Sequence, residues 1–205
     1  HYLIAIHFGH DIPLGSRLYF GRWMPFSYRF ADHIIAVSEY TKQDMVSHLQ
    51  IDPAKITAIP SAADERFVPI TDRELIDPVL TKFGTGPDFL LHVGTINPRK
   101  NLEFLVRVFA KVRSELARPT KLVITGKKGW YYESLFQLVH DLMLDDAVVF
   151  TGYVSEEEKV VLYNTASVLA FPSLYEGFGL PPLEAMQCGT PVIASHTSSN
   201  PEVLG

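Results

Sequence analysis

Two carboxylates bracket a glycine-rich turn in the last quarter of the chain. Glu176 stands directly before the turn and Glu184 follows it, with seven residues between them. The apolar run 167–171 predicts a buried strand before the turn, and two prolines predict a helix from 181 or 182 to 188. A strand, a glycine turn and a helix N-terminus form an anion site, because free amides and the helix dipole both favour negative charge.

Carboxylates at such a place suit sugar hydroxyls better than phosphate. An acid next to a phosphate cradle is a poor phosphate ligand, whereas the acid of dinucleotide sites accepts a hydrogen bond from a ribose hydroxyl. The alternative is an ordinary strand–turn–helix unit in which Glu184 only stabilises the first turn of its helix. Spacing alone leaves both interpretations open, because a glycine turn is a weak signal.

Composition bounds the class of protein. The 205 residues are 47% hydrophobic and 20% charged, which predicts a globular core in one large or two small domains. The net charge of −5, without a long basic run, argues against nucleic acid as a partner. No apolar run approaches a membrane span, no signal peptide is visible, and the single cysteine, Cys188, excludes an internal disulfide framework. These features predict a cytoplasmic protein.

The first third of the chain carries two histidines where a ligand is expected. Residues 2–6 predict a strand, and His7 and His10 follow its C-terminal end, where open α/β sheets place ligands. The alternative, which the residues alone favour, is a pair of ordinary loop histidines. Trp23 and Phe26 belong to a predicted helix over 16–30 and are expected to pack in the core. Contact with a membrane surface or with a further part of the chain is the alternative for these rings.

Strands and helices alternate along the whole chain, which predicts parallel pairing with right-handed crossovers. Ser38 is the expected cap of a helix that runs to residue 49. The proline-rich region 69–87, with a helix over 73–83, is interpreted as a connection between a first domain, 1–68, and a second, 88–205. The other predicted strands cover 33–37, 56–59, 89–93, 121–125, 148–150 and 191–194, and the other predicted helices 102–116, 130–144 and 155–165.

Polar loops follow several strands of the second half, and in a parallel sheet these loops share one edge. Loops 94–100, 152–155 and 175–180 are therefore expected to line one crevice. Arg99 and Lys100 lie next to the positive end of the helix that Asn101 is expected to cap, which is unfavourable unless an anion binds there. A solvated pair of loop cations is the alternative. The sequence has no Walker motif and no clustered metal ligands, so no metal site is predicted.

These motifs resemble the GT-B glycosyltransferases of family 4, especially their mannosyl- and glucosyltransferase-like members. The match from 172 to 192 (PSLYEGFGLPPLEAMQCGTPV) is highly specific. Further matches are HVGTINPRKN at 92–101, TGYV at 151–154, AVSEYT at 36–41 and the His10–Asp11 pair. The chain departs from the family at Pro60–Asp64, which reads PSAAD in place of PNGVD, and at Asn200, which replaces an aliphatic residue.

The resemblance implies an α/β fold of two Rossmann-like parallel-sheet domains that face each other across a cleft, both incomplete because the chain is cut at both ends. The second domain would hold a UDP- or GDP-sugar. The implied contacts are Arg99 and Lys100 to the diphosphate, with Gly94 allowing close approach; Tyr153 and Val154 to the base; Glu184 to the ribose; Glu176, Gly177, Phe178, Gly179 and Leu180 to the donor sugar and phosphate; and His7 or His10 to the transferred sugar.

The implied reaction is transfer of a hexose, mannose or glucose, to a glycan or lipid-linked acceptor, with retention of configuration and without a metal or cofactor. An oxocarbenium-like transition state is expected, with the cations and the helix N-terminus stabilising the leaving diphosphate. No residue presents itself as a covalent nucleophile. The alternatives are a nucleotide-sugar-binding scaffold without turnover and a phosphorylase or epimerase of the same fold. Peripheral contact with the inner face of the plasma membrane is compatible with this reaction.

Overall fold

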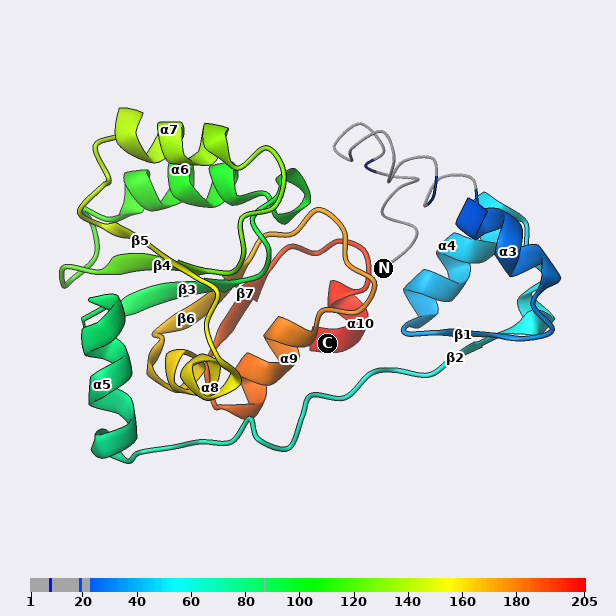
Figure 1. Cartoon of the computed structure of the whole chain (residues 1–205), viewed down its shortest axis with the longest axis horizontal. Helices are drawn as coiled ribbons and strands as arrows, with labels where there is room; N and C mark the ends of the chain where they lie inside the picture. Colours follow the sequence, from blue (N-terminus) through cyan, green and yellow to red (C-terminus); the bar gives the residue numbers. More distant parts are fainter. Residues whose placement is uncertain (1–7, 9–18, 20–22, 87) are drawn as a thin grey trace. The chain divides into compact units, whose positions relative to one another are not determined.

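The computed structural model describes residues 8, 19, 23–86 and 88–205 (Figure 1). The chain divides into two units, and the division does not follow sequence order. The first unit contains residues 1–62 together with 174–180 and 196–205, and the second contains 63–173 and 181–195. The domain limits predicted from the sequence, at 68 and 87, stay a prediction.

The second unit is built on a five-stranded, fully parallel sheet with the strand order β5-β4-β3-β6-β7. This confirms the predicted α/β class. The central strand β3 (Phe89–Val93) reads FLLHV without a polar alternation, which is typical of a strand buried on both faces. The others are β4 (Lys121–Thr125), β5 (Val148–Gly152), β6 (Val168–Phe171) and β7 (Val192–Ala194).

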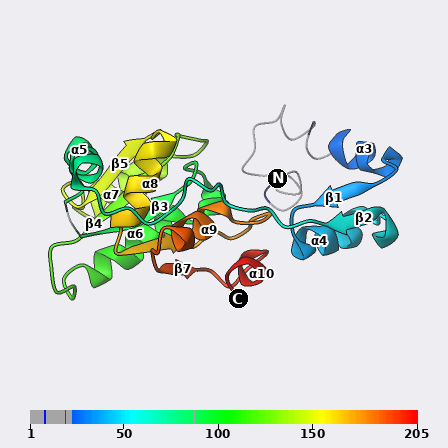
Figure 2. The same ribbon diagram turned by 90° about the horizontal axis from the view of Figure 1, so that it is seen from below.

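Helices cover both faces of this sheet. Figure 1 shows α6 (Leu102–Val112) and α7 (Glu133–Asp141) on one face and α5 (Arg73–Phe83) and α8 (Glu156–Thr165) on the other; Figure 2 turns the same ribbon by 90°. α9 (Leu180–Gln187) brings Ala185 into the cluster that α8 joins. The helix predicted over 73–83 is therefore present, and it packs within the second unit.

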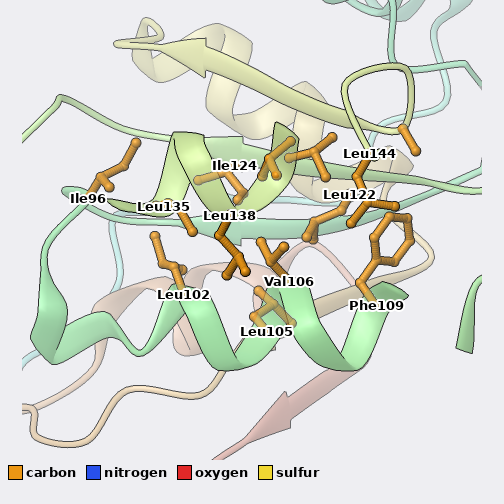
Figure 3. Close-up of a cluster of buried hydrophobic side chains, with 13 residues drawn as sticks. Ile96, Leu102, Leu105, Val106, Phe109, Leu122, Ile124, Leu135, Leu138 and Leu144 are labelled. Carbon is orange, nitrogen blue, oxygen red and sulfur yellow. The ribbon is translucent and has the colours of Figure 1, made fainter. Parts of the chain in front are cut away.

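The apolar face of α6 explains why this helix forms here. Its buried residues follow the three-four spacing of one helix face, and Figure 3 shows Leu102, Val106 and Phe109 directed toward Leu122 and Ile124 of β4. The helix ends at Val112, soon after its last buried residue, rather than at 116 as expected.

The helix starts show which local signals were reliable. Ser155 and Glu158 form the predicted capping box of α8. The residue type of Asn101 predicted a side-chain cap for α6, but its side chain makes no such hydrogen bond. Asn101 has φ 54° and ends the short 3₁₀ turn η4 (Pro98–Lys100), so only its main-chain carbonyl serves the helix.

The described part of the first unit contains a parallel pair of short strands, β1 (Ile34–Ala36) and β2 (Ile56–Ala58), joined through α4 (Glu39–Leu49) and the 3₁₀ turn η3 (Pro53–Lys55). This is the predicted crossover, and Ser38 caps α4 as expected by accepting a hydrogen bond from the amide of Thr41. Helix α10 (Asn200–Leu204) completes the unit. The strand predicted over 2–6 lies outside the described residues.

The expected packing of Trp23 and Phe26 in the core is wrong. Helix α3 (Met24–Phe30) has no buried residue, and Trp23 and Phe26 are 69% and 56% exposed. The Phe26 ring instead contacts the Phe30 ring at a tilt of 58°, with the centroids 4.8 Å apart. Among the described residues of the unit, the core forms around Met45 and Tyr175 on other elements.

Two phenylalanines of α6 provide a matched test of this packing. Phe109 is 1% exposed and Phe104, on the same helix, is 55% exposed. We expect Phe109→Ala to lower the free energy of unfolding by about 3–5 kcal/mol, because it leaves a cavity in the cluster of Figure 3. Phe104→Ala should change it by no more than about 0.5 kcal/mol. Urea unfolding measures both, and equal losses would contradict the described face of α6.

Candidate functional site

The loops that follow β3, β4 and β5 are joined by main-chain hydrogen bonds at one edge of the sheet. The Gly94 amide donates to Thr125 O at 2.9 Å, and the Gly126 amide donates to Gly152 O at 2.9 Å. Beyond the strands, Ile96 also donates to Lys127 O at 2.9 Å. The predicted loop 94–100 therefore lies beside a lysine-containing loop, 126–129, which in turn adjoins 152–154.

Glycine is required where the first two loops meet. A Cβ on Gly126 would lie 2.1 Å from the Gly94 carbonyl oxygen, and its φ of +148° excludes most side chains. A Cβ on Gly94 would lie 3.0 Å from Cε of Lys100. In this structure the space beside Gly94 is therefore occupied by the Lys100 side chain.

Lys100 is a buried cation, not a solvated loop residue. It is 6% exposed, and its Nζ lies 4.6 Å from the centroid of the Phe171 ring. A cation–π contact compensates part of the cost of removing an ammonium group from water. Arg99, the other predicted cation, is half-buried in the same turn. Both positive groups thus lie at the edge of the sheet where the sequence predicted a diphosphate.

The two residues predicted near a base differ in what they offer. Tyr153 is 68% exposed, and Lys127 Nζ lies 5.0 Å from its ring centroid. Val154 is 6% exposed, and its side chain packs in the core cluster with Leu162 and Tyr163. Lys127 was not singled out from the sequence, although a pair of lysines directly after a predicted strand was a signal for it.

Glu184 has protein partners that the sequence did not reveal. Because α9 begins at Leu180, this carboxylate lies beyond the first helical turn where it was expected. The Tyr163 hydroxyl donates to its Oε2 at 2.7 Å, and Lys159 Nζ lies 3.5 Å from the same oxygen. Burial, followed by the negative charge of Glu184, holds the pKa of Tyr163 well above its ordinary value, so Tyr163 remains a donor.

The glycine turn at 176–179 belongs to the first unit. Glu176 is 7% exposed, and its amide donates to Ser198 Oγ at 2.8 Å. The Gly177 carbonyl accepts hydrogen bonds from Ser38 and Thr41 of the α4 N-terminus. Ser38 was identified from the sequence only as a helix cap, since no local pattern shows what a hydroxyl contacts far along the chain. Lys100 and Glu184 belong to the second unit, so one mouth shared with Glu176 stays a prediction.

Some predictions lie outside what the structure describes. His7 and His10 are not among the described residues. Within residues 8, 19, 23–86 and 88–205, no group of His, Cys, Asp and Glu has the arrangement of a metal site. No helix in the same part of the chain has the length and apolar character needed to cross a membrane.

The close approach of two loops at Gly126 gives a stability prediction. Gly152→Ala meets no atom within 4 Å and should cost about 1–2 kcal/mol from its positive φ alone. Gly126→Ala has a backbone penalty of its own at φ +148° and also collides with the Gly94 carbonyl, so we expect it to cost at least about 1–3 kcal/mol more. Chemical unfolding of both variants measures the difference, and an equal cost would mean that the loops do not meet as described.

The thiol of Cys188 reports on the environment of Glu184. Burial, followed by the Glu184 carboxylate, raises the pKa of this thiol from 9.0 to about 11. Thiolate is the reactive form, and its amount rises with pH, so alkylation at pH 8 should be about a hundredfold slower than for an unperturbed thiol. Glu184→Gln removes one cause and should move the rate profile to lower pH. A profile centred near 9 in the unchanged protein would contradict the described environment.

Comparison with known proteins agrees with these motifs. The family model described as "Glycosyl transferases group 1" matches residues 73–205, and that described as "Glycosyltransferase Family 4" matches residues 1–67. A serotype-specific mannosyltransferase WbdA of Escherichia coli is 34% identical over 178 residues, which are 85% of this chain and 22% of that protein. O-antigen chain mannosyltransferase B of Escherichia coli is 34% identical over 84% of this chain and 45% of its own length.

Solved structures show the same fold. The crystal structure of Anabaena Alr3699/HepE in complex with UDP and glucose superposes with a TM-score of 0.79 at 20% identity, over 91% of this chain and 50% of that one. The chain thus spans about half or less of the relatives that it matches. Its two parallel-sheet units are those of a GT-B fold. Because the family model matches residues 73–205, the chain belongs to the group 1 glycosyltransferase family.

Proposed function

We propose that the protein containing this chain is a glycosyltransferase. Its substrates are a nucleoside diphosphate hexose, with mannose or glucose as the sugar, and a glycan or lipid-linked acceptor. The observation that carries the proposal is the match to the group 1 family model over residues 73–205. Two curated relatives at 34% identity are mannosyltransferases, and the HepE structure is a complex with UDP and glucose.

The second unit supplies groups of the right chemistry for the nucleoside diphosphate. Arg99 and Lys100 neutralise the diphosphate and stabilise the charge that develops on it as it leaves. The exposed ring of Tyr153 offers a face for the base, and the main chain at Val154 is its neighbour. Glu184 accepts from the ribose hydroxyls through its carboxylate, of which Oε2 already binds Tyr163. Gly94 keeps the main chain close to Lys100.

The glycine turn supplies the groups for the sugar and its phosphate. Glu176 accepts from sugar hydroxyls, and the amides from Gly177 to Leu180 donate to oxygen atoms of the donor. His7 or His10 contacts the transferred hexose. The reaction retains the anomeric configuration and uses neither a metal ion nor a cofactor, because the amides and cations carry the charge stabilisation. We place the protein in the cytoplasm, with peripheral membrane contact through the exposed rings of α3.

Binding and turnover test this function in the whole protein. We expect UDP- or GDP-mannose, or the corresponding glucose donor, to raise the melting temperature, because a ligand that binds only the folded state stabilises it. Lys100→Met and Glu184→Gln should each weaken binding about tenfold or more, since each removes a charged hydrogen-bonding partner. Lys111→Met, an exposed lysine on α6, is the matched control.

Transfer of radiolabelled sugar to an acceptor then separates the alternatives. Binding without turnover would support a scaffold, and dependence on free phosphate would support a phosphorylase. Unchanged binding in both Lys100→Met and Glu184→Gln would refute the assignment of the site.

A further inference from the structure

Buried hydroxyl groups hold the main chain of the glycine turn. Ser38 Oγ donates to the Gly177 carbonyl oxygen at 2.6 Å, and Thr41 Oγ1 donates to the same oxygen at 2.9 Å. Ser38 is fully buried and Thr41 is 8% exposed. Both lone pairs of this carbonyl are therefore occupied by donors from the start of α4.

A third hydroxyl, that of Ser199, contacts the carbonyl groups on either side of Gly177. Ser199 Oγ lies 3.0 Å from the Glu176 carbonyl oxygen and 2.8 Å from that of Phe178, and the residue is fully buried. Ser199 has one hydroxyl hydrogen, which these two carbonyl oxygens share, so the three consecutive carbonyl groups 176 to 178 all point at hydroxyl groups. This arrangement fixes the orientation of three successive peptide planes.

The orientation of these carbonyls dictates where the amides point. In a planar trans peptide the N–H lies on the opposite side from the preceding C=O. The amides of Gly177, Phe178 and Gly179 must therefore point away from the hydroxyl cluster. Across the described ranges 23–86 and 88–205, these three amides donate no hydrogen bond. Gly177 and Gly179 are buried and Phe178 is half-buried. Because buried main-chain donors are almost always paired, this turn is prepared for an acceptor that is not part of the described chain.

The direction of the hydroxyl bonds is determined by the Gly177 carbonyl oxygen, which can only accept, so Ser38 and Thr41 must donate to it. Ser38 Oγ also accepts from the Thr41 amide at 2.9 Å and lies 2.9 Å from Thr41 Oγ1. The Glu202 carboxylate accepts from the amides of Glu39 and Tyr40 at 2.8 and 3.1 Å. The first amides of the helix therefore have side-chain acceptors of their own, and the hydroxyls of Ser38 and Thr41 serve as donors to the turn.

We propose that Ser38, Thr41 and Ser199 are positioning residues for donor binding: they orient the glycine turn so that its three amides face the anionic part of a nucleoside diphosphate sugar. This inference rests on the proposed glycosyltransferase function and names residues to which the family resemblance assigned no role. None of the three touches the donor, because their hydroxyl hydrogens point to the opposite side of the peptide planes.

Isosteric substitution tests the proposal in the whole protein. Thr41→Val removes the hydroxyl and keeps the shape, so one bond to the Gly177 carbonyl is lost. We expect KM for the sugar donor to rise about tenfold, because a turn that is free to rotate presents its amides poorly, while KM for the acceptor stays unchanged. Thr41→Ser keeps the hydroxyl and should restore the donor KM. Ser199→Ala should raise the donor KM in the same way, and it provides the test if Thr41→Val folds poorly.

A matched control separates positioning from loss of stability. Thr165 on α8 donates its hydroxyl to the Val161 carbonyl at 2.7 Å, so Thr165→Val removes the same kind of bond elsewhere. Its donor KM should remain within about twofold of the unchanged protein. If Thr41→Val and Ser199→Ala behave like Thr165→Val, or if Thr41→Ser fails to restore binding, the positioning role is wrong although the transferase function stands. If the unchanged protein neither binds nor transfers a nucleotide sugar, the function itself fails.

Discussion

The first unit depends on hydrogen bonds that join its α4 helix to a segment far along the sequence. The bonds from Ser38 and Thr41 to Gly177 link positions 139 and 136 residues apart. Tyr175, two residues earlier, packs in the core with Met45 and donates to Asp44 at 2.6 Å. The buried Tyr175 and the Gly177 carbonyl, which accepts two hydrogen bonds, together specify the course of the turn. Displacing either one leaves buried polar groups without partners.

The second unit depends on a different constraint, the close approach of main chains beyond its strands. The hydrogen bonds of the sheet continue from β3 and β4 into the loops through Gly94 and Gly126, and at Gly126 no side chain fits. This continuation holds the loop of Lys100 at the edge of the sheet. A buried lysine over Phe171 then provides positive charge with little freedom to move, which in the proposed function suits a group that binds a phosphate.

Local patterns predicted most elements; one failure has a local cause, and the others come from long-range contacts. The apolar periodicity of α6 and the capping box of α8 depend on neighbours in the sequence, and both were found as expected. The side-chain cap by Asn101 failed because the 3₁₀ turn before it imposes a left-handed conformation. The partner of Glu184, Tyr163, lies 21 residues away on another helix, and no spacing rule reaches it. For the same reason Ser38 was recognised as a cap but not as a support of the turn.

In the proposed function, neutral hydroxyls suit the turn better than charged groups would. A lysine holding the Gly177 carbonyl would add a full charge behind the peptide planes and bind phosphate by itself, competing with the amides for position. Ser38 and Thr41 add none, so the amide dipoles alone define the direction of binding at the turn. Glu202 contributes to the same effect, because its carboxylate occupies the positive end of α4, which would otherwise attract an anion to the wrong amides. Full positive charge is left to Arg99 and Lys100, at the sheet edge of the second unit.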